Sequence, residues 1–173
     1  QHWLMNAGLF VGDDELTGGY AAPRVMFNYH LAPDHTLRFG ISKASRAPTL
    51  VEARGDVRVF IPFPSAVSGT YLPLLQSRRA LDPERLSTRE VAYYGRWPNS
   101  HLSLDVRAYD ERFDKEIRAQ GIPGSTTSRE FLNGPDLRIR GLEYQLTWEP
   151  LPGARLLLNQ SFNRLTREGE PSP

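Results

Sequence analysis

Apolar and polar residues alternate with a period of two along most of this 173-residue chain. Such alternation is typical of a β-strand whose two faces meet different surroundings, whereas an amphipathic helix repeats every three to four residues. The pattern therefore predicts an all-β chain of about seven strands. They are expected at residues 25–31, 37–42, 90–97, 102–108, 142–148 and 156–163, with a weaker strand at about 3–11.

The predicted connections fall into two lengths. Short turns rich in Pro, Asn, Asp and Gly, which favour tight backbone, are expected at 32–35, 97–100 and 150–153. Longer connections are expected at 12–22, 47–86 and 119–136. Alternating short and long connections indicate an antiparallel up-and-down transmembrane β-barrel with short periplasmic turns and long extracellular loops. A sheet packed on a protein core also alternates, so a soluble binding module, for example a carbohydrate-binding one, stays an alternative, as does a passive porin-like channel.

Aromatic residues and one irregularity refine this prediction. Trp97 and Trp148 each come just before a short turn, as expected for the aromatic girdle at a bilayer interface. Around Gly141 the alternation slips, because the apolar residues Leu137 and Ile139 are out of phase with the strand that follows. We expect either a β-bulge at Gly141 or a position of Leu137 and Ile139 above the membrane.

Composition excludes several functions. The 21 Lys and Arg are balanced by 20 Asp and Glu, which argues against nucleic acid as a partner. There is no Cys, no His pair at ligand spacing and no nucleophile or phosphate-loop motif, so we expect neither a cofactor, a metal site nor an enzyme. Asp13–Glu15 is expected to be a solvated loop, and the carboxylates at positions 110, 111, 114 and 116 a charged extension above the membrane rather than catalytic groups.

Three segments carry a family resemblance. The first is Leu-Arg-Phe-Gly-Ile-Ser at 37–42, followed by Ser-Arg-Ala-Pro-Thr-Leu-Val-Glu at 45–52. The second is Leu-Asp-Pro-Glu at 81–84, followed by a strand with Glu90 and Gly95. The third is Asn133, then Arg-Gly-Leu-Glu-Tyr at 140–144 and Trp148. Together, and in this order, they resemble the TonB-dependent outer-membrane receptors, in particular siderophore receptors.

The resemblance implies that residues 1–173 are part of the β-barrel of such a receptor, whose plug domain and closing strands are absent from this sequence. It implies a location in the outer membrane of a Gram-negative bacterium, with outer-membrane lipid around the barrel. It also implies active uptake of a scarce nutrient, most often a ferric siderophore or similar chelate, energised by TonB through the plug domain.

An uncharged stretch at 59–77 is the candidate ligand-binding segment. It is long enough for a membrane helix, but its three prolines argue against one and indicate an apolar loop. Arginine and aromatic side chains suit the anionic chelate that the resemblance implies. The alternative is a loop that folds over the barrel mouth with its arginines paired to acids. The predicted ligand-binding residues are Arg54, Arg58, Phe60, Phe63, Tyr71, Arg78 and Arg79.

Overall fold

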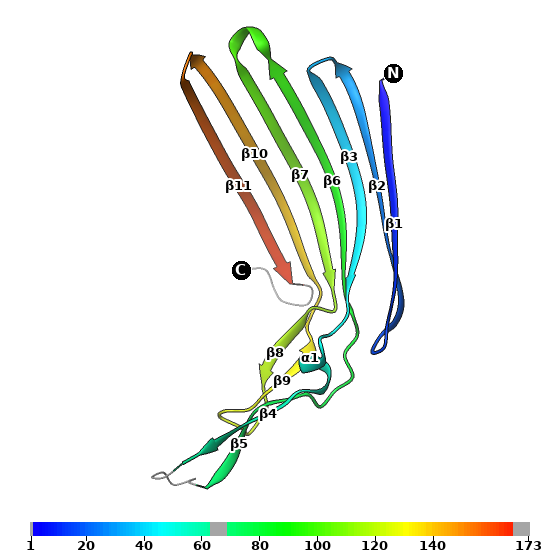
Figure 1. Ribbon diagram of the computed structural model, residues 1–173, viewed down its shortest axis with the longest axis vertical. Helices are drawn as coiled ribbons and strands as arrows, with labels where there is room; N and C mark the ends of the chain where they lie inside the picture. Colours follow the sequence, from blue (N-terminus) through cyan, green and yellow to red (C-terminus); the bar gives the residue numbers. More distant parts are fainter. Residues whose placement is uncertain (1, 63–68, 168–173) are drawn as a thin grey trace.

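A computed structural model describes residues 2–62 and 69–167 of the chain. Seven long strands form one curved sheet, and a smaller sheet extends from one end of it (Figure 1). The strands of the large sheet are β1 (Trp3–Asp14), β2 (Gly18–Ala32), β3 (His35–Arg46), β6 (Glu84–Trp97), β7 (Leu102–Asp114), β10 (Leu137–Leu151) and β11 (Ala154–Arg167).

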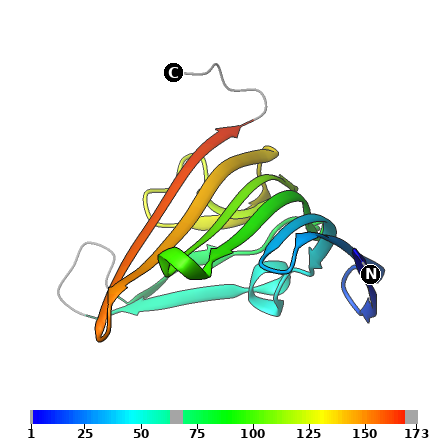
Figure 2. The ribbon, with the colours of Figure 1, turned by 90° about the horizontal axis from the view of Figure 1, so that it is seen from above.

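The order of strands in the large sheet is β1-β2-β3-β6-β7-β10-β11, and every neighbouring pair is antiparallel. Strands that neighbour each other in this sheet also follow each other along the chain, apart from the excursions into the small sheet. This is the up-and-down connectivity predicted from the sequence. Viewed from above, the sheet is an open segment of wall whose two edges, β1 and β11, lie far apart (Figure 2).

One face of the large sheet is apolar and uncovered. Cross-strand pairing places Met5, Phe27, Phe39, Val91, Ala108, Leu142 and Phe162 in a single row. Fourteen large apolar side chains on this face are between 41% and 67% exposed, and within the described residues neither a helix nor a second sheet packs against them. A packed protein core therefore does not account for the alternation.

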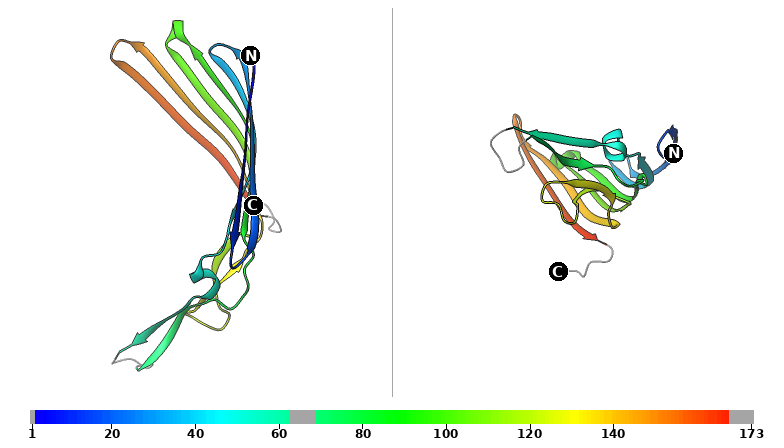
Figure 3. Two further views of the ribbon diagram at one scale, coloured as in Figure 1. Left: turned by 45° about the vertical axis from the view of Figure 1, so that its right-hand side comes forward. Right: turned by 90° about the horizontal axis from the view of Figure 1, so that it is seen from below.

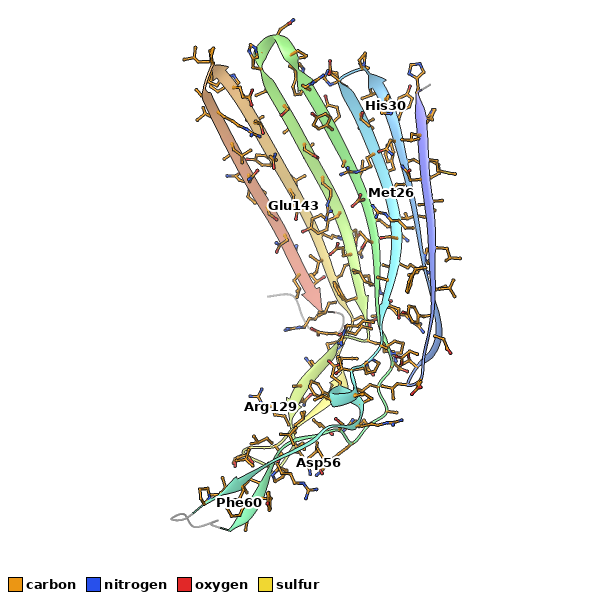
Figure 4. The ribbon with its side chains drawn as sticks, in the orientation of Figure 1. Met26, His30, Asp56, Phe60, Arg129 and Glu143 are labelled. Carbon is orange, nitrogen blue, oxygen red and sulfur yellow. The ribbon has the colours of Figure 1, made fainter. Side chains whose placement is uncertain are left out.

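The opposite face is polar. The row that runs through Asn28, Arg38, Ala92, Arg107, Glu143 and Ser161 is directly behind the apolar rows. The few buried apolar residues of the large sheet, among them Met26 and Ala92, also lie on this face. In Figure 4, Met26, His30 and Glu143 are spread over this sheet, on β2 and β10. A sheet with lipid-compatible side chains on one face and charges on the other matches the wall of a membrane barrel.

The limit of the apolar face runs diagonally across the strands. On β1 the apolar side chains reach Val11, on β3 they reach Ile41, and on β11 they end at Phe162. Phe162 lies in the row of Met5, six residues before Val11, and Val91, Ala108 and Leu142 lie in that same row, so the limit falls from β1 to β6 and is level from β6 to β11. A level membrane boundary crosses tilted strands in this diagonal way.

The connection at residues 12–22 was predicted to be long, and this is wrong. β1 and β2 pair up to Asp14 and Gly18. The Asp14 carboxylate accepts hydrogen bonds from the backbone N–H groups of Leu16 and Thr17 at 2.9 and 3.2 Å, and Gly18 has a φ of 76°. This aspartate turn followed by a left-handed glycine closes the hairpin at the end of the sheet where the long connections lie. Loop lengths are thus not strictly sorted.

The two other long connections contain structure of their own, which sequence alternation did not reveal. Residues 47–86 contain a short helix and a β-hairpin, and 119–136 contribute to a second hairpin. Figure 3 shows these elements leaving the end of the large sheet and bending to one side. They are α1 (Leu50–Arg54), β4 (Asp56–Ile61), β5 (Thr70–Gln76), β8 (Ile117–Gly121) and β9 (Arg129–Asn133), and we call them the extension.

The two tryptophans lie where the sequence predicted. Trp97 ends β6 and Trp148 lies near the end of β10, and both pair with Leu102, so they occupy one cross-strand row. That row is next to the short turns, one of which contains η1 (Pro98–Ser100). No described helix is long and apolar enough to cross a membrane.

The predicted bulge at Gly141 is absent. β10 pairs with β7 without interruption from Leu137 to Trp148, and Gly141 lies opposite Tyr109. An added Cβ at Gly141 would collide with the Tyr109 ring, so glycine is required by a side chain that lies across the neighbouring strand. The strand is regular, so Leu137 and Ile139 lie on the polar face, beyond the apolar rows, which is the arrangement that the second explanation above expects.

Replacing Gly141 by Ala is expected to destabilise the barrel by about 1 kcal/mol, because the Tyr109 ring must leave its position over the strand. Urea unfolding of the lipid-folded barrel measures this change. Gly8→Ala is the control, since an added Cβ there meets nothing within 4 Å. The double variant with Tyr109→Ala should remove most of the penalty, and a full penalty in that background would contradict this explanation.

Candidate functional site

The candidate ligand-binding stretch is a β-hairpin rather than an irregular loop. β4 and β5 are antiparallel, with Phe60 opposite Tyr71 and Arg58 opposite Pro73. The rings of Phe60 and Tyr71 have centroids 5.2 Å apart, and both residues are exposed. Because alternate residues share a face, Arg58 lies on the same face as this aromatic pair. The structure thus brings three predicted ligand-binding residues together, and Figure 4 shows Phe60 near the far end of the extension.

The other predicted residues are dispersed. Arg54 is the last residue of α1, whereas Arg78 and Arg79 follow β5. Phe63 lies outside the described residues. Two of the arginines are already paired, since Arg58 binds Asp56 at 2.6 Å and Arg79 binds Glu130 at 3.3 Å. This pairing with acids is what the alternative interpretation of the loop predicted. The hairpin face stays the candidate ligand-binding surface because it carries the exposed rings of Phe60 and Tyr71.

The two hairpins of the extension are joined into one four-stranded sheet in the order β4-β5-β9-β8. The hydroxyl of the buried Ser128 donates to the backbone oxygen of Pro73 at 2.7 Å. Arg79 meets the carboxylate of Glu130, which is only 6% exposed, from the β5 side. These contacts hold the two hairpins of the extension together as one sheet rather than as two independent loops.

A cluster of three charged residues, the junction cluster, connects the extension to the large sheet. Arg46 ends β3, and its Nε donates to Glu84 Oε2 at 2.5 Å while its Nη1 donates to Glu52 Oε2 at 2.9 Å. The other oxygen of Glu84 accepts the backbone N–H of Ile117 at 2.7 Å. One guanidinium therefore ties together the end of β3, the start of β6 and α1, and Glu84 adds the start of β8.

The helix α1 explains why Glu52 is held in place. Thr49 is its N-cap, and the Thr49 hydroxyl accepts the backbone N–H of Glu52 at 3.2 Å. The Glu52 carboxylate in turn accepts the backbone N–H of Thr49 at 2.7 Å, which completes a capping box. The spacing Thr-x-x-Glu is a sequence signal that could have identified this role.

The electrostatics of the junction cluster follow from these contacts. The hydrogen bond from Arg46 lowers the pKa of Glu84 below its ordinary value of 4.5, against the opposing effect of burial. Burial raises the pKa of Glu52, but the hydrogen bonds from Arg46 and Thr49 outweigh it and the net pKa is lowered. Both acids lie beyond the apolar rows and are ionised at neutral pH.

Asn133, one of the residues that carry the family resemblance, forms a second clamp at the base of the extension. Its Oδ1 accepts the backbone N–H of Asp82 at 2.9 Å, and its Nδ2 donates to the backbone oxygens of Asp82 and Lys115 at 3.0 and 2.8 Å. Lys115, which has a φ of 62°, also binds the Asp82 carboxylate at 2.8 Å. The amide thus fixes a strained turn after β7 against the segment that leads into β6.

Charges on the polar face of the large sheet form a ladder. Arg38 and Arg107 lie 3.7 and 3.5 Å from the carboxylate of Glu90, and Arg107 lies 3.8 Å from Glu143. The guanidinium of Arg107 also stacks on the Tyr109 ring at 4.7 Å. Such a surface suits water or a polar partner and is incompatible with hydrocarbon.

The remaining acidic groups show no arrangement for metal binding. Within residues 2–62 and 69–167, no group of three or more His, Asp or Glu side chains is placed to hold a metal ion. Asp14 serves its own turn, Asp110 pairs with Arg138 and Arg140, and Asp114 pairs with Arg112. Two of the four carboxylates of the predicted charged extension, Asp110 and Asp114, are therefore held in ion pairs.

Residues 4–172 match the family model described as TonB dependent receptor-like, beta-barrel. The chain belongs to the TonB-dependent receptor family. This family consists of transport receptors, and its barrels reside in the outer membrane of Gram-negative bacteria. A search of curated proteins found no match.

Solved structures share the fold of this TonB-dependent receptor chain. The siderophore receptor PirA from Pseudomonas aeruginosa superposes with a TM-score of 0.81 at 18% identity, over 96% of this chain and 32% of that one. PirA from Acinetobacter baumannii gives 0.70 at 18% identity, over 94% and 25%. The iron transporter FrpB from Neisseria meningitidis gives 0.62 at 12% identity, over 95% and 24%. The chain thus spans about a third or less of these structures and is a partial barrel.

Proposed function

We propose that this chain is part of the barrel wall of an active-transport receptor that takes up a ferric siderophore across the outer membrane, energised by TonB. The observation that carries the proposal is the apolar face, which spans the seven strands and over which no helix or second sheet packs within residues 2–62 and 69–167. The ladder around Glu90 then faces the barrel interior, where a plug domain carried by the rest of the receptor would lie.

Membership of the family and the names of its structural neighbours support the substrate class. PirA is a siderophore receptor, and PfeA, another structural neighbour, is a ferric enterobactin receptor. The extension projects from the end opposite the short turns, which is the extracellular end of such a barrel. Its aromatic hairpin face is placed to meet a chelate that arrives from outside.

Growth and uptake test this function. A deletion strain of the parent bacterium should lose growth on one ferric siderophore as the sole iron source and lose uptake of that labelled chelate, while ferrous iron restores growth. Removal of TonB should abolish the same uptake. Uptake that continues without TonB would favour a passive channel, and recovery of the protein in the soluble fraction would favour a soluble binding module.

Replacing both Phe60 and Tyr71 by Ser should raise the siderophore concentration for half-maximal uptake about tenfold, because the exposed aromatic pair is lost from the hairpin face. The maximal rate should stay within about twofold, since TonB coupling lies elsewhere. Radiolabelled uptake at graded concentrations measures both. Leu72→Ser, on the opposite face of the hairpin, is the matched control, and an equal effect there would assign the loss to folding of the hairpin.

A further inference from the structure

Between the apolar rows and the extension, the outward face of the large sheet carries a concentration of positively charged side chains. Two successive cross-strand rows follow Phe39 and Val91 in the direction of the extension. Pairing in these rows aligns six cations with a single carboxylate, that of Asp110. The cations are Lys43, Arg89, Arg112, Arg138, Arg140 and Arg164.

Ion pairing leaves half of this charge available. Asp110 is held by Arg138 at 2.9 Å and by Arg140 at 3.3 Å, and Arg112 is paired with Asp114 and Asp136. In contrast, within the part of the chain that the structure describes, Lys43, Arg89 and Arg164 have no carboxylate partner. On an exposed surface, unpaired cations gathered at this density repel one another unless an anion lies between them.

A groove lies in the middle of this charged region. It has a volume of about 480 Å³. The part of its lining on the side of β2 and the apolar rows is apolar, with Pro23, Val25 and Ile41. The rest of its lining is mostly cationic, with Lys43, Arg89, Arg112 and Arg138 around Asp110. Apart from Ser42 and Thr88, every residue that lines the groove belongs to the outward, apolar-bearing set of its strand, so the groove opens toward the surroundings of the barrel.

We propose that this groove binds the phosphorylated headgroup of a lipid in the outer leaflet, with the phosphate at Lys43 and Arg89 and the acyl chains along Val25 and Ile41. This rests on the proposed membrane location. The apolar floor continues without a break into the exposed apolar rows, which a soluble phosphate ligand would not use. The position at the upper limit of the apolar face is the depth at which lipid phosphates lie, and arginine and lysine are the residues that bind phosphate.

The test uses the intact receptor, purified in uncharged detergent. It is titrated with lipid A that carries both phosphates, with lipid A from which they have been removed, and with inorganic phosphate. Native mass spectrometry gives the bound fraction. We expect binding of phosphorylated lipid A alone. Binding of the dephosphorylated lipid with equal affinity, or of inorganic phosphate in its place, would overturn the proposal.

Lys43→Gln with Arg89→Gln should weaken binding of phosphorylated lipid A about 10- to 30-fold, since two unpaired cations are lost. The matched control is Arg24→Gln with Arg129→Gln. It removes the same charge from the polar face of β2 and from the extension, where Figure 4 shows Arg129, and it should leave lipid affinity unchanged. Equal weakening by both double variants would overturn the proposal. TonB-dependent uptake is measured in parallel, so that normal uptake with unchanged lipid affinity refutes the lipid site alone, whereas a receptor absent from the outer membrane refutes the proposed function.

Discussion

Leu146→Arg should destabilise the lipid-folded barrel by about 2–4 kcal/mol, the largest effect expected for any single change in this sheet. Leu146 lies on the apolar face of β10, between Leu142 and Trp148, and pairs with Leu104 and Leu158 on the two neighbouring strands. An arginine there would be placed near the middle of the hydrocarbon layer. Urea titration of the intact barrel in lipid vesicles measures the loss.

The neighbouring residue provides a stringent control. Gln145 lies on the polar face of the same strand, is exposed, and pairs with Asp105, so Gln145→Arg gains an acidic neighbour and should cost about 0.5 kcal/mol or less. Equal destabilisation by the two variants would mean that the apolar face does not meet lipid. It would also remove the basis of the proposed membrane location.

Arg46→Met should open the junction between the large sheet and the extension, at a cost of about 1–2 kcal/mol. The side chains of Glu52 and Glu84 are only 14% and 17% exposed, so loss of the shared guanidinium leaves two largely buried carboxylates close together. The exposure of Arg46 itself, 44%, keeps the effect below that of a fully buried pair. Hydrogen exchange should accelerate in α1 and at the start of β8, while the large sheet stays protected.

Arg58→Met is the matched control for this change. Arg58 also binds a carboxylate at short distance, but that pair with Asp56 joins two residues of one strand and is about half exposed on both sides. We expect no measurable change in hydrogen exchange at the junction. If both variants open it, general loss of positive charge is responsible and the junction cluster has no special role.

Acid should open the same junction in the unchanged protein. Because the pKa values of Glu52 and Glu84 are lowered by folding, their contribution to stability is complete above about pH 4.5 and declines as the pH falls through the lowered values. Protection of the α1 amides should therefore be constant from pH 7 to pH 5 and fall in more acidic solution. In Arg46→Met this acid step should be absent or reversed.

The strands could be predicted from the sequence because lipid and water impose opposite preferences on alternate residues. Outside the lipid-facing part of the sheet this contrast is missing, and there the predicted boundaries and loops were wrong. Residues 12–22 look like a loop, but Asp14 and Gly18 allow a three-residue turn that alternation does not reveal. The hairpins of the extension expose apolar residues such as Val59, Phe60 and Tyr71 and bury the polar residues Ser128 and Glu130, so their alternation is weak. Gly141 resembled a bulge because its partner Tyr109, thirty-two residues earlier, is invisible to local reasoning.

The candidate site shows the same division. The arginine and aromatic content of the stretch at 59–77 indicated a ligand surface, and the structure groups Arg58, Phe60 and Tyr71 on one hairpin face. It could not indicate that Arg79 is bound to Glu130, because that partner comes from another hairpin. The junction cluster could not be predicted as a cluster. Arg46 shares its guanidinium between Glu52, six residues away, and Glu84, and the contact with Glu84 depends on the pairing of β3 with β6.

The diagonal limit of the apolar face also sets the slope of the strands. The limit falls by six residues between β1 and β6, from Val11 to Val91 in the row of Met5, and is level from β6 to β11, which averages one residue for each of the six steps between seven strands. At about 3.3 Å per residue and about 4.8 Å per step, this corresponds to an inclination of roughly 35° from the membrane normal, within the range of closed barrels. A strand paired with the free edge of β1 should accordingly carry apolar residues beyond the cross-strand row of Val11, while the depth of its hydrocarbon-facing segment in the membrane stays the same.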